Sequence, residues 1–175
     1  MSSEVHANQE QAAAGGRRRG GKYLTFFLGE EEYGIEILRV NEIIGMLPIT
    51  PIPQTDPWVR GVVNLRGKVI PVLDLRLKLG MEPAEETEET CIIVVQMQGT
   101  LIGVIVDKVS EVLDIDEAQV EDPPALGMGV ETDLLLGIGK AEGKVKLLLD
   151  IDRVLTPAEL DLVDGALQEE EQTPA

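Results

Sequence analysis

The residues that most often carry out nucleophilic or acid–base catalysis are nearly absent from this chain. It contains one cysteine, Cys91, and one histidine, His6, which lies in a polar N-terminal stretch. A Ser-His-Asp or Cys-His catalytic group would need that histidine, so neither group is predicted. A single cysteine excludes an intrachain disulfide, and one Cys with one His cannot build a Cys/His zinc site.

Acidic residues occur in two patterns that suggest divalent-cation ligands. These are Asp114-Ile-Asp116-Glu117 and Asp150-Ile-Asp152, and neither has the twelve-residue spacing of a calcium loop. Phosphate-binding motifs are missing, because the chain has no Gly-Lys-Ser/Thr loop and no GxGxxG after a strand. We therefore predict a protein that is not an enzyme and has no cofactor and no metal. A metal-dependent enzyme built on acidic residues is the remote alternative, and it predicts thermal stabilisation by magnesium or calcium.

Charge and composition exclude two further classes of function. The 175 residues include 32 Asp plus Glu against 15 Lys plus Arg, which gives a formal net charge of −17. Such a chain does not attract the phosphates of nucleic acids, and its few aromatic side chains offer little surface for stacking bases. The longest apolar run, Leu101–Val106, is far shorter than the roughly 18 residues of a spanning helix, and no signal-peptide core is present. We predict no nucleic-acid binding, no direct membrane insertion and a cytoplasmic location.

Two stretches of the chain, residues 22–79 and 91–156, repeat each other. Identical residues recur at an offset of 69 residues and, further along, at an offset of 76. The matched pairs are Gly34/Gly103, Val40/Val109, Glu42/Glu111, Gly61/Gly137, Gly67/Gly143, Lys68/Lys144, Val69/Val145 and Asp74/Asp150. Two copies are too few for a solenoid, so the repeat predicts two similar modules of about 60 residues each.

The repeats lie inside a folded part that is predicted to cover residues 22–165. Residues 1–21 are polar and glycine-rich, include Arg17-Arg18-Arg19, and are predicted to be a disordered arm. Residues 80–90 are predicted to be an acidic linker between the repeats, and 166–175 a disordered acidic tail.

The modules are predicted to consist mainly of β-strands. Residues 92–95, 101–106 and 147–149 are β-branched or aliphatic runs that do not alternate with polar residues, which is typical of strands buried on both faces. Residues 62–70 predict a hairpin that turns at Arg66-Gly67, with its counterpart at Glu142-Gly143. Pro71, inside that strand-like run, indicates a sheet edge or a bulge.

One helix is predicted near the C-terminus. Thr156 has the type of a capping residue, Pro157 occupies the first helical position and Glu159 the third. Leu160, Val163 and Leu167 follow at helical spacing, which predicts a helix that covers the core with one apolar face.

The two hairpin tips differ in charge, because Arg66 in one corresponds to Glu142 in the other. Positions that are alike in both copies are predicted to be scaffold, whereas exposed positions that differ are candidates for specific binding. Arginine suits an interface because its guanidinium offers a rigid fork of donors and an apolar plane. A solvated turn arginine is the competing interpretation.

Residues 35–43 and 59–76 resemble the CheW family of bacterial and archaeal chemotaxis coupling proteins. The second segment contains Asn64-Leu-Arg-Gly67 and then Pro71-Val-Leu-Asp-Leu-Arg76. The resemblance continues through 103–113 and 136–139 and covers about residues 22–165. It implies a mainly β fold of two five-stranded SH3-like barrels that pack together, with a C-terminal helix.

The resemblance also implies a role as a non-enzymatic adaptor. Members of the family join the cytoplasmic tip of methyl-accepting chemotaxis receptors to the histidine kinase CheA, by docking on its regulatory domain, and so assemble membrane-associated receptor arrays. A CheW-like coupler of a non-motility pathway, such as surface sensing or pilus control, is the alternative, because the same fold and contacts serve both.

Residue by residue, the resemblance implies a receptor contact. The matching positions are Val40, Glu42, Gly61, Asn64, Arg66 and Val109. Core packing is the competing interpretation for the two valines, since both repeats carry valine there, and a structural ion pair is the competing one for Glu42. Asn64 and Arg66 have no identical counterpart in the second repeat, which favours a functional role. Gly61 is expected to fix the backbone of the same segment.

A second contact, with the kinase or a neighbouring copy in receptor rings, is implied for the segment that begins at Glu121 and includes Leu126. The chain carries Glu121 and Asp122 where a basic residue can occur in the family. A partner that meets this segment would need compensating basic residues.

Overall fold

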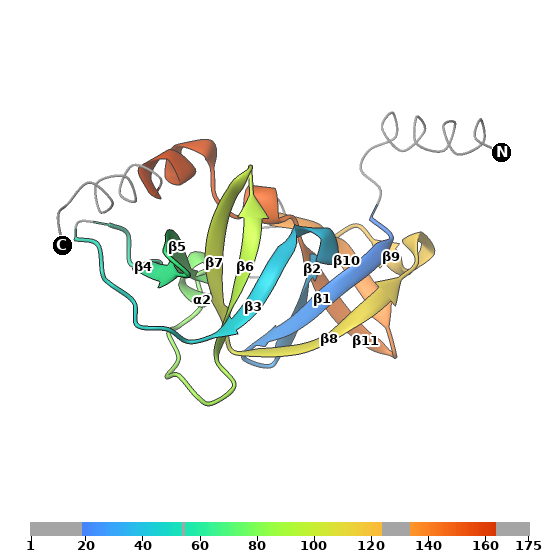
Figure 1. Cartoon of the computed structure of the whole chain (residues 1–175). Coiled ribbons are helices and arrows are strands. Elements are labelled where there is room, and N and C mark those ends of the chain that lie inside the picture. Colours follow the sequence, from blue (N-terminus) through green and yellow to red (C-terminus); the bar gives the residue numbers. More distant parts are fainter. Residues whose placement is uncertain (1–18, 54, 124–133, 164–175) are drawn as a thin grey trace.

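The computed structural model describes residues 19–53, 55–123 and 134–163, and these form a mainly β structure (Figure 1). The strands are β1 (Gly21–Leu28), β2 (Glu31–Glu36), β3 (Val40–Gly45), β4 (Val59–Leu65), β5 (Lys68–Asp74), β6 (Cys91–Met97), β7 (Thr100–Val106), β8 (Lys108–Ile115), β9 (Val120–Glu121), β10 (Leu135–Ala141) and β11 (Lys144–Leu149). The helical elements are η1 (Ile37–Arg39), α2 (Leu75–Lys78), η2 (Glu117–Gln119), η4 (Ile151–Arg153) and a helix over 157–163.

The strands form two sheets that lie side by side (Figure 1). We call the sheet β3-β6-β7-β5-β4 the five-stranded unit, and β8-β1-β2-β11-β10-β9 the six-stranded unit. In each unit one neighbouring pair is parallel, β5 with β7 and β2 with β11. The prediction of a mainly β fold with two small units and a C-terminal helix is confirmed. In the described residues the end strands of each sheet do not pair, so the sheets are not closed barrels, and two-residue β9 adds a sixth strand to one of them.

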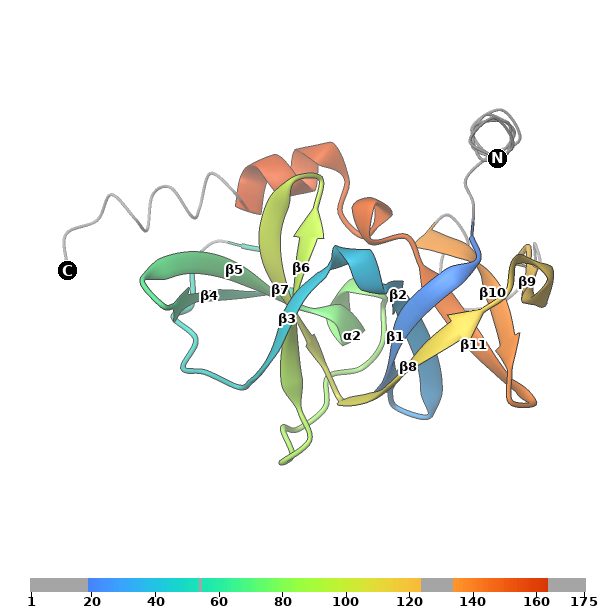
Figure 2. The same cartoon turned by 45° about the vertical axis from the view of Figure 1, so that its right-hand side comes forward.

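Each unit takes strands from both sequence repeats. The chain leaves the six-stranded unit through η1 and β3, and returns through β8 (Figure 2). The five-stranded unit therefore combines β3, β4 and β5 with β6 and β7 of the second repeat, and the six-stranded unit combines β1 and β2 with β8 to β11. The repeats 22–79 and 91–156 are thus not separate bodies in space.

The two units repeat the same pairing scheme in detail. Gly34 opposes Leu148 in one parallel pair, and its sequence counterpart Gly103 opposes Val72 in the other. Register shifts fall at equivalent places as well, before Gly61 in β4 and before Gly137 in β10. The match supports the offsets of 69 and 76 as a true structural correspondence.

The largest apolar core belongs to both units. It includes Phe26 and Leu28 from β1, Met97 from β6 and Val104 from β7, and all four side chains have essentially no exposed surface. Burial of such side chains stabilises a fold by about 1.5–3 kcal/mol each. Because both units contribute side chains to this core, they pack as one body.

The local predictions for the turns are confirmed. Arg66-Gly67 and Glu142-Gly143 both have two consecutive positive φ angles, 54° and 87° in the first case and 54° and 74° in the second. This is the backbone of a type I′ hairpin turn, which matches the right-handed twist of the strands.

The predicted helix start is confirmed atom by atom. The Thr156 amide donates to Glu159 Oε1 at 2.9 Å, and the Glu159 amide donates to Thr156 Oγ1 at 3.1 Å. This reciprocal pair is a capping box. Leu160 and Val163 are buried in the shared core, whereas Leu167 lies outside the described residues.

Of the two alternatives predicted for Pro71, the sheet edge is wrong, because β5 lies between β4 and β7. A bulge does occur next to it, since the β4–β5 register shifts just before Gly61. Pro71 opposes Val62. The amide and the carbonyl of Val62 both bond to Thr50, at 2.9 Å each, so this pair of strand residues does not need the amide that proline lacks. The ladder to β7 begins one residue later, at Val72.

The N-terminal arm is shorter than predicted. Gly21 begins β1, and Arg19 and Gly20 form hydrogen bonds to Glu117. Residues 1–18 and 166–175, where the rest of the arm and the acidic tail are predicted, lie outside the described residues. No helix in the described part of the chain is long and apolar enough to span a membrane.

Candidate functional site

The residues that the resemblance assigns to receptor contact lie almost entirely on the five-stranded unit. Val40 and Glu42 are on β3, Gly61 and Asn64 on β4, Arg66 in the β4–β5 turn, and Val109 on β8 of the other unit. Within the group, Glu42 and Arg66 contact each other directly.

Glu42 and Arg66 join the two ends of the five-stranded sheet. An Arg66 Nη2 donates to Glu42 Oε2, although β3 and β4 are the first and last strands in the sheet order. We call this place, where the Glu42–Arg66 ion pair joins the two ends of the sheet without strand pairing, the seam. The Arg66 side chain is 69% exposed and the Glu42 side chain 24% exposed. An exposed ion pair of this kind contributes about 0–1 kcal/mol to stability, so it orients the guanidinium while leaving it accessible to a partner.

Asn64 fixes the turn that carries Arg66. Its Oδ1 accepts a hydrogen bond from the Gly67 amide at 2.8 Å. Asparagine commonly stabilises turns by bonding to the backbone a few residues on. The exposed amide group of Asn64 therefore has a structural function besides any contact with a partner.

Gly61 makes room for the segment that follows β3. A Cβ at this position would lie 2.1 Å from the carbonyl oxygen of Thr50, and the φ angle of Gly61 is +139°. Thr50 in turn pairs with Val62. Glycine is thus required where the chain between β3 and β4 crosses the end of β4, as expected for a residue that fixes the local backbone.

Val40 and Val109 occupy equivalent positions at the starts of β3 and β8. Both are half-buried and pack against the shared core. Val40 opposes Val95, and Val109 opposes Phe26. The buried part of each side chain fits the competing interpretation as a core residue. The exposed part remains available for contact with a partner.

The second predicted contact is only partly described. Glu121 is exposed on β9 and forms an ion pair with Lys140 at 2.5 Å. Its neighbour Asp122 accepts from Arg19 Nη1 at 2.6 Å. The two carboxylates that depart from the family pattern are therefore both neutralised by cations of this chain. Leu126 lies outside the described residues.

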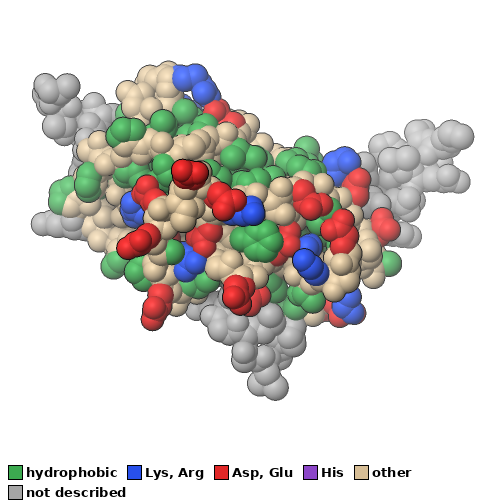
Figure 3. Space-filling model, turned by 90° about the horizontal axis from the view of Figure 1, so that it is seen from below, with side chains coloured by type: hydrophobic (Ala, Val, Ile, Leu, Met, Phe, Trp, Pro, Cys, Tyr) green, Lys and Arg blue, Asp and Glu red, His purple; other side chains and the backbone are tan. Residues whose placement is uncertain are grey.

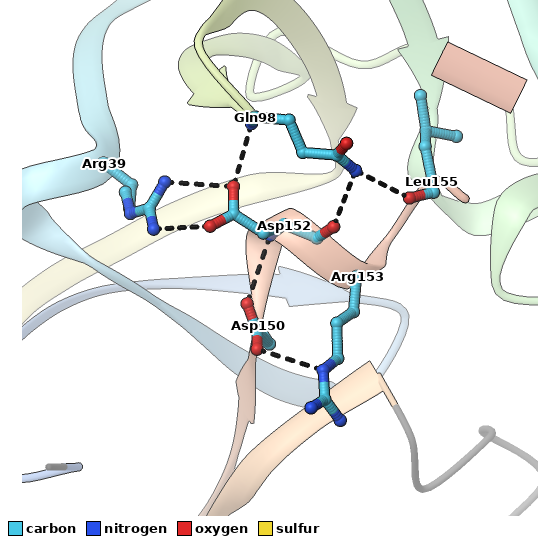
Figure 4. Close-up of polar contacts among 6 residues, drawn as sticks. All are labelled: Arg39, Gln98, Asp150, Asp152, Arg153 and Leu155. Carbon is cyan, nitrogen blue, oxygen red and sulfur yellow. Dashed lines mark hydrogen bonds and ion pairs between the residues drawn. The ribbon is translucent and has the colours of Figure 1, made fainter. Parts of the chain in front are cut away.

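A polar network that the sequence interpretation missed holds the crossing between the units (Figure 4). Arg39 of η1 binds both carboxylate oxygens of Asp152 in η4, at 3.0 and 2.5 Å. The backbone amide of Gln98 donates to the same carboxylate at 2.9 Å, and its side-chain Nε2 donates to the backbone carbonyls of Asp152 and Leu155. A bidentate Arg–carboxylate pair is among the stronger polar contacts.

An Arg–Asp pair also holds the second crossing, where the chain returns from β7 to β8. Here the aspartate lies at the crossing and the arginine on α2, whereas at the first crossing the arginine lies at the crossing and the aspartate on η4. Arg76 of α2 binds Asp107, with Nε–Oδ1 at 2.8 Å and Nη2–Oδ2 at 2.6 Å. The Gly29 amide donates to Asp107 at 2.7 Å, as Gln98 does to Asp152. The hydrogen bond from Arg76 holds the pKa of the Asp107 carboxyl below its usual value, and the pKa of Arg76 is raised by the same bond.

The acidic patterns in the sequence are used for structure. Asp152 binds Arg39, Asp114 binds Lys22 at 2.9 Å, and Glu117 binds the amides of Arg19 and Gly20. No group of three or more potential metal ligands occurs in the described ranges.

Cys91 is half-buried, and burial raises the pKa of its thiol. A raised pKa disfavours the thiolate, which is the reactive form of cysteine.

An open cleft of about 820 Å³ lies between α2, the β6–β7 turn and the start of the C-terminal helix. Two of its charged groups, Lys78 and Glu159, pair with each other at 2.7 Å, and a third, Asp152, binds Arg39 outside the cleft. Lys78 also lies over the Trp58 ring, 4.8 Å from its centroid. These contacts join α2 to the C-terminal helix.

Acidic side chains are spread over the face seen in Figure 3, with lysines and arginines among them. The described ion pairs, such as Lys108 with Glu89 at 3.3 Å, follow this mixed pattern. Both signs of charge are therefore mixed on this face, which presents no large uniformly basic area to a polyanion.

Comparison with known proteins finds a matching family model and several similar proteins. Residues 22–159 match the family model for the CheW-like domain. The chemotaxis protein CheW of Klebsiella aerogenes is 38% identical over 150 residues, which cover 86% of this chain and 90% of that protein. The CheW of Rhizobium meliloti is 34% identical over 140 residues, with 80% and 90% covered. The crystal structure of the scaffolding protein TtCheW from Thermoanaerobacter tengcongensis superposes with a TM-score of 0.73 at 36% identity, covering 78% of this chain and 92% of that one.

Proposed function

The chain belongs to the CheW-like family, whose members are non-enzymatic adaptors of chemotaxis, and we propose that it couples methyl-accepting chemotaxis receptors to the histidine kinase CheA. In this proposal it is a rigid adaptor with two contact faces. The seam of the five-stranded unit takes the helical hairpin at the cytoplasmic tip of a receptor, and the β9 end of the six-stranded unit contacts the kinase.

The difference between the two hairpin tips is the observation that carries the receptor assignment. Arg66 is exposed, fixed by Asn64 through the turn and oriented by Glu42. The corresponding positions of the six-stranded unit are Glu142 and Glu111, two residues of like charge. Of the two hairpin tips, that of the five-stranded unit is the one that presents an oriented guanidinium, which suits recognition of carboxylates on a partner helix.

The kinase contact is assigned to the end of the six-stranded unit that contains Glu121. Apolar surface is expected to supply most of the affinity and the polar groups to set the register. A single contact of micromolar affinity corresponds to about 8 kcal/mol. Repetition of such contacts in an array adds avidity without new chemistry, so a cytoplasmic adaptor would be recruited to membrane-associated receptor arrays.

A calorimetric titration with the regulatory domain of a CheA kinase from the same genome tests this function. The proposal predicts binding with a dissociation constant in the micromolar range or tighter. Thermal unfolding of the same sample with and without magnesium or calcium serves as a control, and no stabilisation is expected. Absence of binding by a folded sample would overturn the coupling function.

A further inference from the structure

The two residues that precede β1, Arg19 and Gly20, are bound to the end of the six-stranded unit that contains β9. Arg19 Nη1 donates to Asp122 Oδ1 at 2.6 Å and to the Leu136 carbonyl at 3.2 Å. The amides of Arg19 and Gly20 donate to Glu117 Oε2 at 2.7 and 2.5 Å. We call Arg19 and Gly20 the strap, because they join the start of the folded chain to residues about 100 positions later.

Tyr23, Gly137 and the strap's own Gly20 determine how closely the strap packs against the unit. The Tyr23 hydroxyl donates to the Arg19 carbonyl at 2.5 Å. A Cβ on Gly20 would lie 2.7 Å from the Glu117 amide nitrogen, and one on Gly137 would lie 3.1 Å from Arg19 Nη1. Glycine at both positions therefore lets the strap lie directly against η2 and β10. The Arg19 side chain is only 23% exposed, so its contacts are partly shielded from solvent.

The strap restrains residues 117–122, as prolines can restrain the equivalent segment of the other unit. There, the equivalent crossing segment pairs with β4 through Thr50 and contains Pro48, Pro51 and Pro53, which restrict its backbone. Residues 117–122 contain no proline, Pro123 and Pro124 come only after them, and the ladder of β9 is two residues long. The hydrogen bonds from Arg19 and Gly20 add to the attachment that the Glu121–Lys140 ion pair gives this segment.

We propose that Arg19 is a positioning residue for the kinase contact at the β9 end of the six-stranded unit, an inference that rests on the function proposed above. Arg19 neutralises Asp122 and holds residues 117–122 against β10, so that Glu121 meets the partner in one fixed arrangement. A segment that is already ordered loses less conformational freedom on binding, and this raises affinity.

The test compares four variants of the full chain: Arg19→Ala, Arg19→Lys, Glu121→Lys and Lys22→Ala. Lys22→Ala is the matched control. It also removes one positive charge and one ion pair, that of Lys22 with Asp114, at the start of β1. Amide hydrogen exchange of residues 117–122 is measured by mass spectrometry, and binding to the CheA regulatory domain by calorimetry. Thermal unfolding verifies that each variant is folded.

The inference predicts that Arg19→Ala speeds exchange in 117–122 by about tenfold, since hydrogen bonds to charged groups are lost. It also predicts kinase binding about three- to tenfold weaker. Arg19→Lys keeps the charge without the planar fork and should be intermediate. Lys22→Ala should change neither measurement.

The outcomes separate this inference from the function on which it rests. Absence of kinase binding by the unmodified chain overturns both. Binding that Glu121→Lys leaves unchanged overturns the assigned contact, and the positioning role with it. Two results overturn the positioning role alone. In the first, Glu121→Lys weakens kinase binding and Arg19→Ala does not. In the second, Arg19→Ala weakens binding but amide exchange in 117–122 is not faster.

Discussion

The five-stranded and six-stranded units share one pairing scheme and differ in where they place charge. At the hairpin tips, Arg66 and Glu42 form an ion pair, whereas Glu142 and Glu111 cannot. Inside the sheets the difference is reversed. The six-stranded unit buries Lys146 against Glu32 at 2.6 Å, and the equivalent positions of the five-stranded unit are Ile70 and Leu101.

This comparison separates scaffold from function. Features that recur in both units, such as the register of the parallel pairs and the glycines at the crossing segments, serve the shared fold. Features that occur once require a local explanation. The exposed Arg66 favours binding, whereas the buried Lys146–Glu32 pair is a structural difference without access to a partner.

Removing the buried charge in the six-stranded unit is expected to have the largest effect. Lys146→Ile leaves the Glu32 carboxylate buried without its cation, and should lower the free energy of unfolding by about 3–5 kcal/mol. The double variant Lys146→Ile, Glu32→Leu makes the unit like its counterpart and should recover most of that loss. Denaturant unfolding measures both. A double variant as unstable as the single one would contradict the account.

A methyl group at the crossing of the five-stranded unit is expected to cost somewhat less. Gly61→Ala brings a Cβ against the Thr50 carbonyl and keeps an unfavourable φ, so a loss of about 2–3 kcal/mol is expected. Gly67→Ala has a φ of +87° with no atom near the new Cβ, and should cost about 1 kcal/mol. Equal losses in the two variants, measured by thermal unfolding, would show that the approach of Thr50 is unimportant.

The crossing pair Arg76–Asp107 is expected to give a smaller effect that depends on pH. The pKa of Asp107 is lower in the folded protein than in an unfolded chain, mainly because Arg76 donates a hydrogen bond to it. The stabilisation is therefore present above the unfolded-state pKa and is lost as the pH falls through the folded-state pKa. Asp107→Asn should lower the free energy of unfolding by about 1–2 kcal/mol at pH 7.

The pH dependence distinguishes that effect from a loss of packing. The difference between wild type and Asp107→Asn should shrink as the pH falls below the folded-state pKa of Asp107, because the wild type then loses the same charge. Asp114→Asn breaks an exposed pair with Lys22 and should cost less than about 0.5 kcal/mol at any pH. A constant difference for Asp107→Asn across the acid range would contradict the assignment.

Local chemistry made much of the fold predictable from the sequence. The turn at Arg66-Gly67 and the helix start at Thr156 depend on residues within four positions of each other, and both occur as predicted. The exchange of strands between repeats was not predictable in this way. The two copies have such similar strands that the sequence does not say whether a hairpin pairs with its own copy or with the other.

The candidate site was predictable to the extent that it depends on the hairpin. The contrast between Arg66 and Glu142 came from comparing the repeats, and a structural ion pair was the competing interpretation for Glu42, which now proves to bind Arg66. The attachments of Asp152 to Arg39 and of Arg19 to Asp122 were missed. Their partners lie more than 100 residues apart, so no local pattern connects them.

A titration of two matched variants tests the proposal that the receptor binds the five-stranded seam through Arg66. Arg66→Ala and Glu142→Ala change equivalent turn residues, each with a φ of 54°, so any effect of alanine on the turn backbone is common to both variants. The receptor's cytoplasmic hairpin tip is titrated against both and against the wild type. We expect Arg66→Ala to weaken binding by about tenfold, or 1.4 kcal/mol, and Glu142→Ala to have no effect. Unchanged affinity in the folded Arg66→Ala variant, or equal losses in the two, would contradict the proposal.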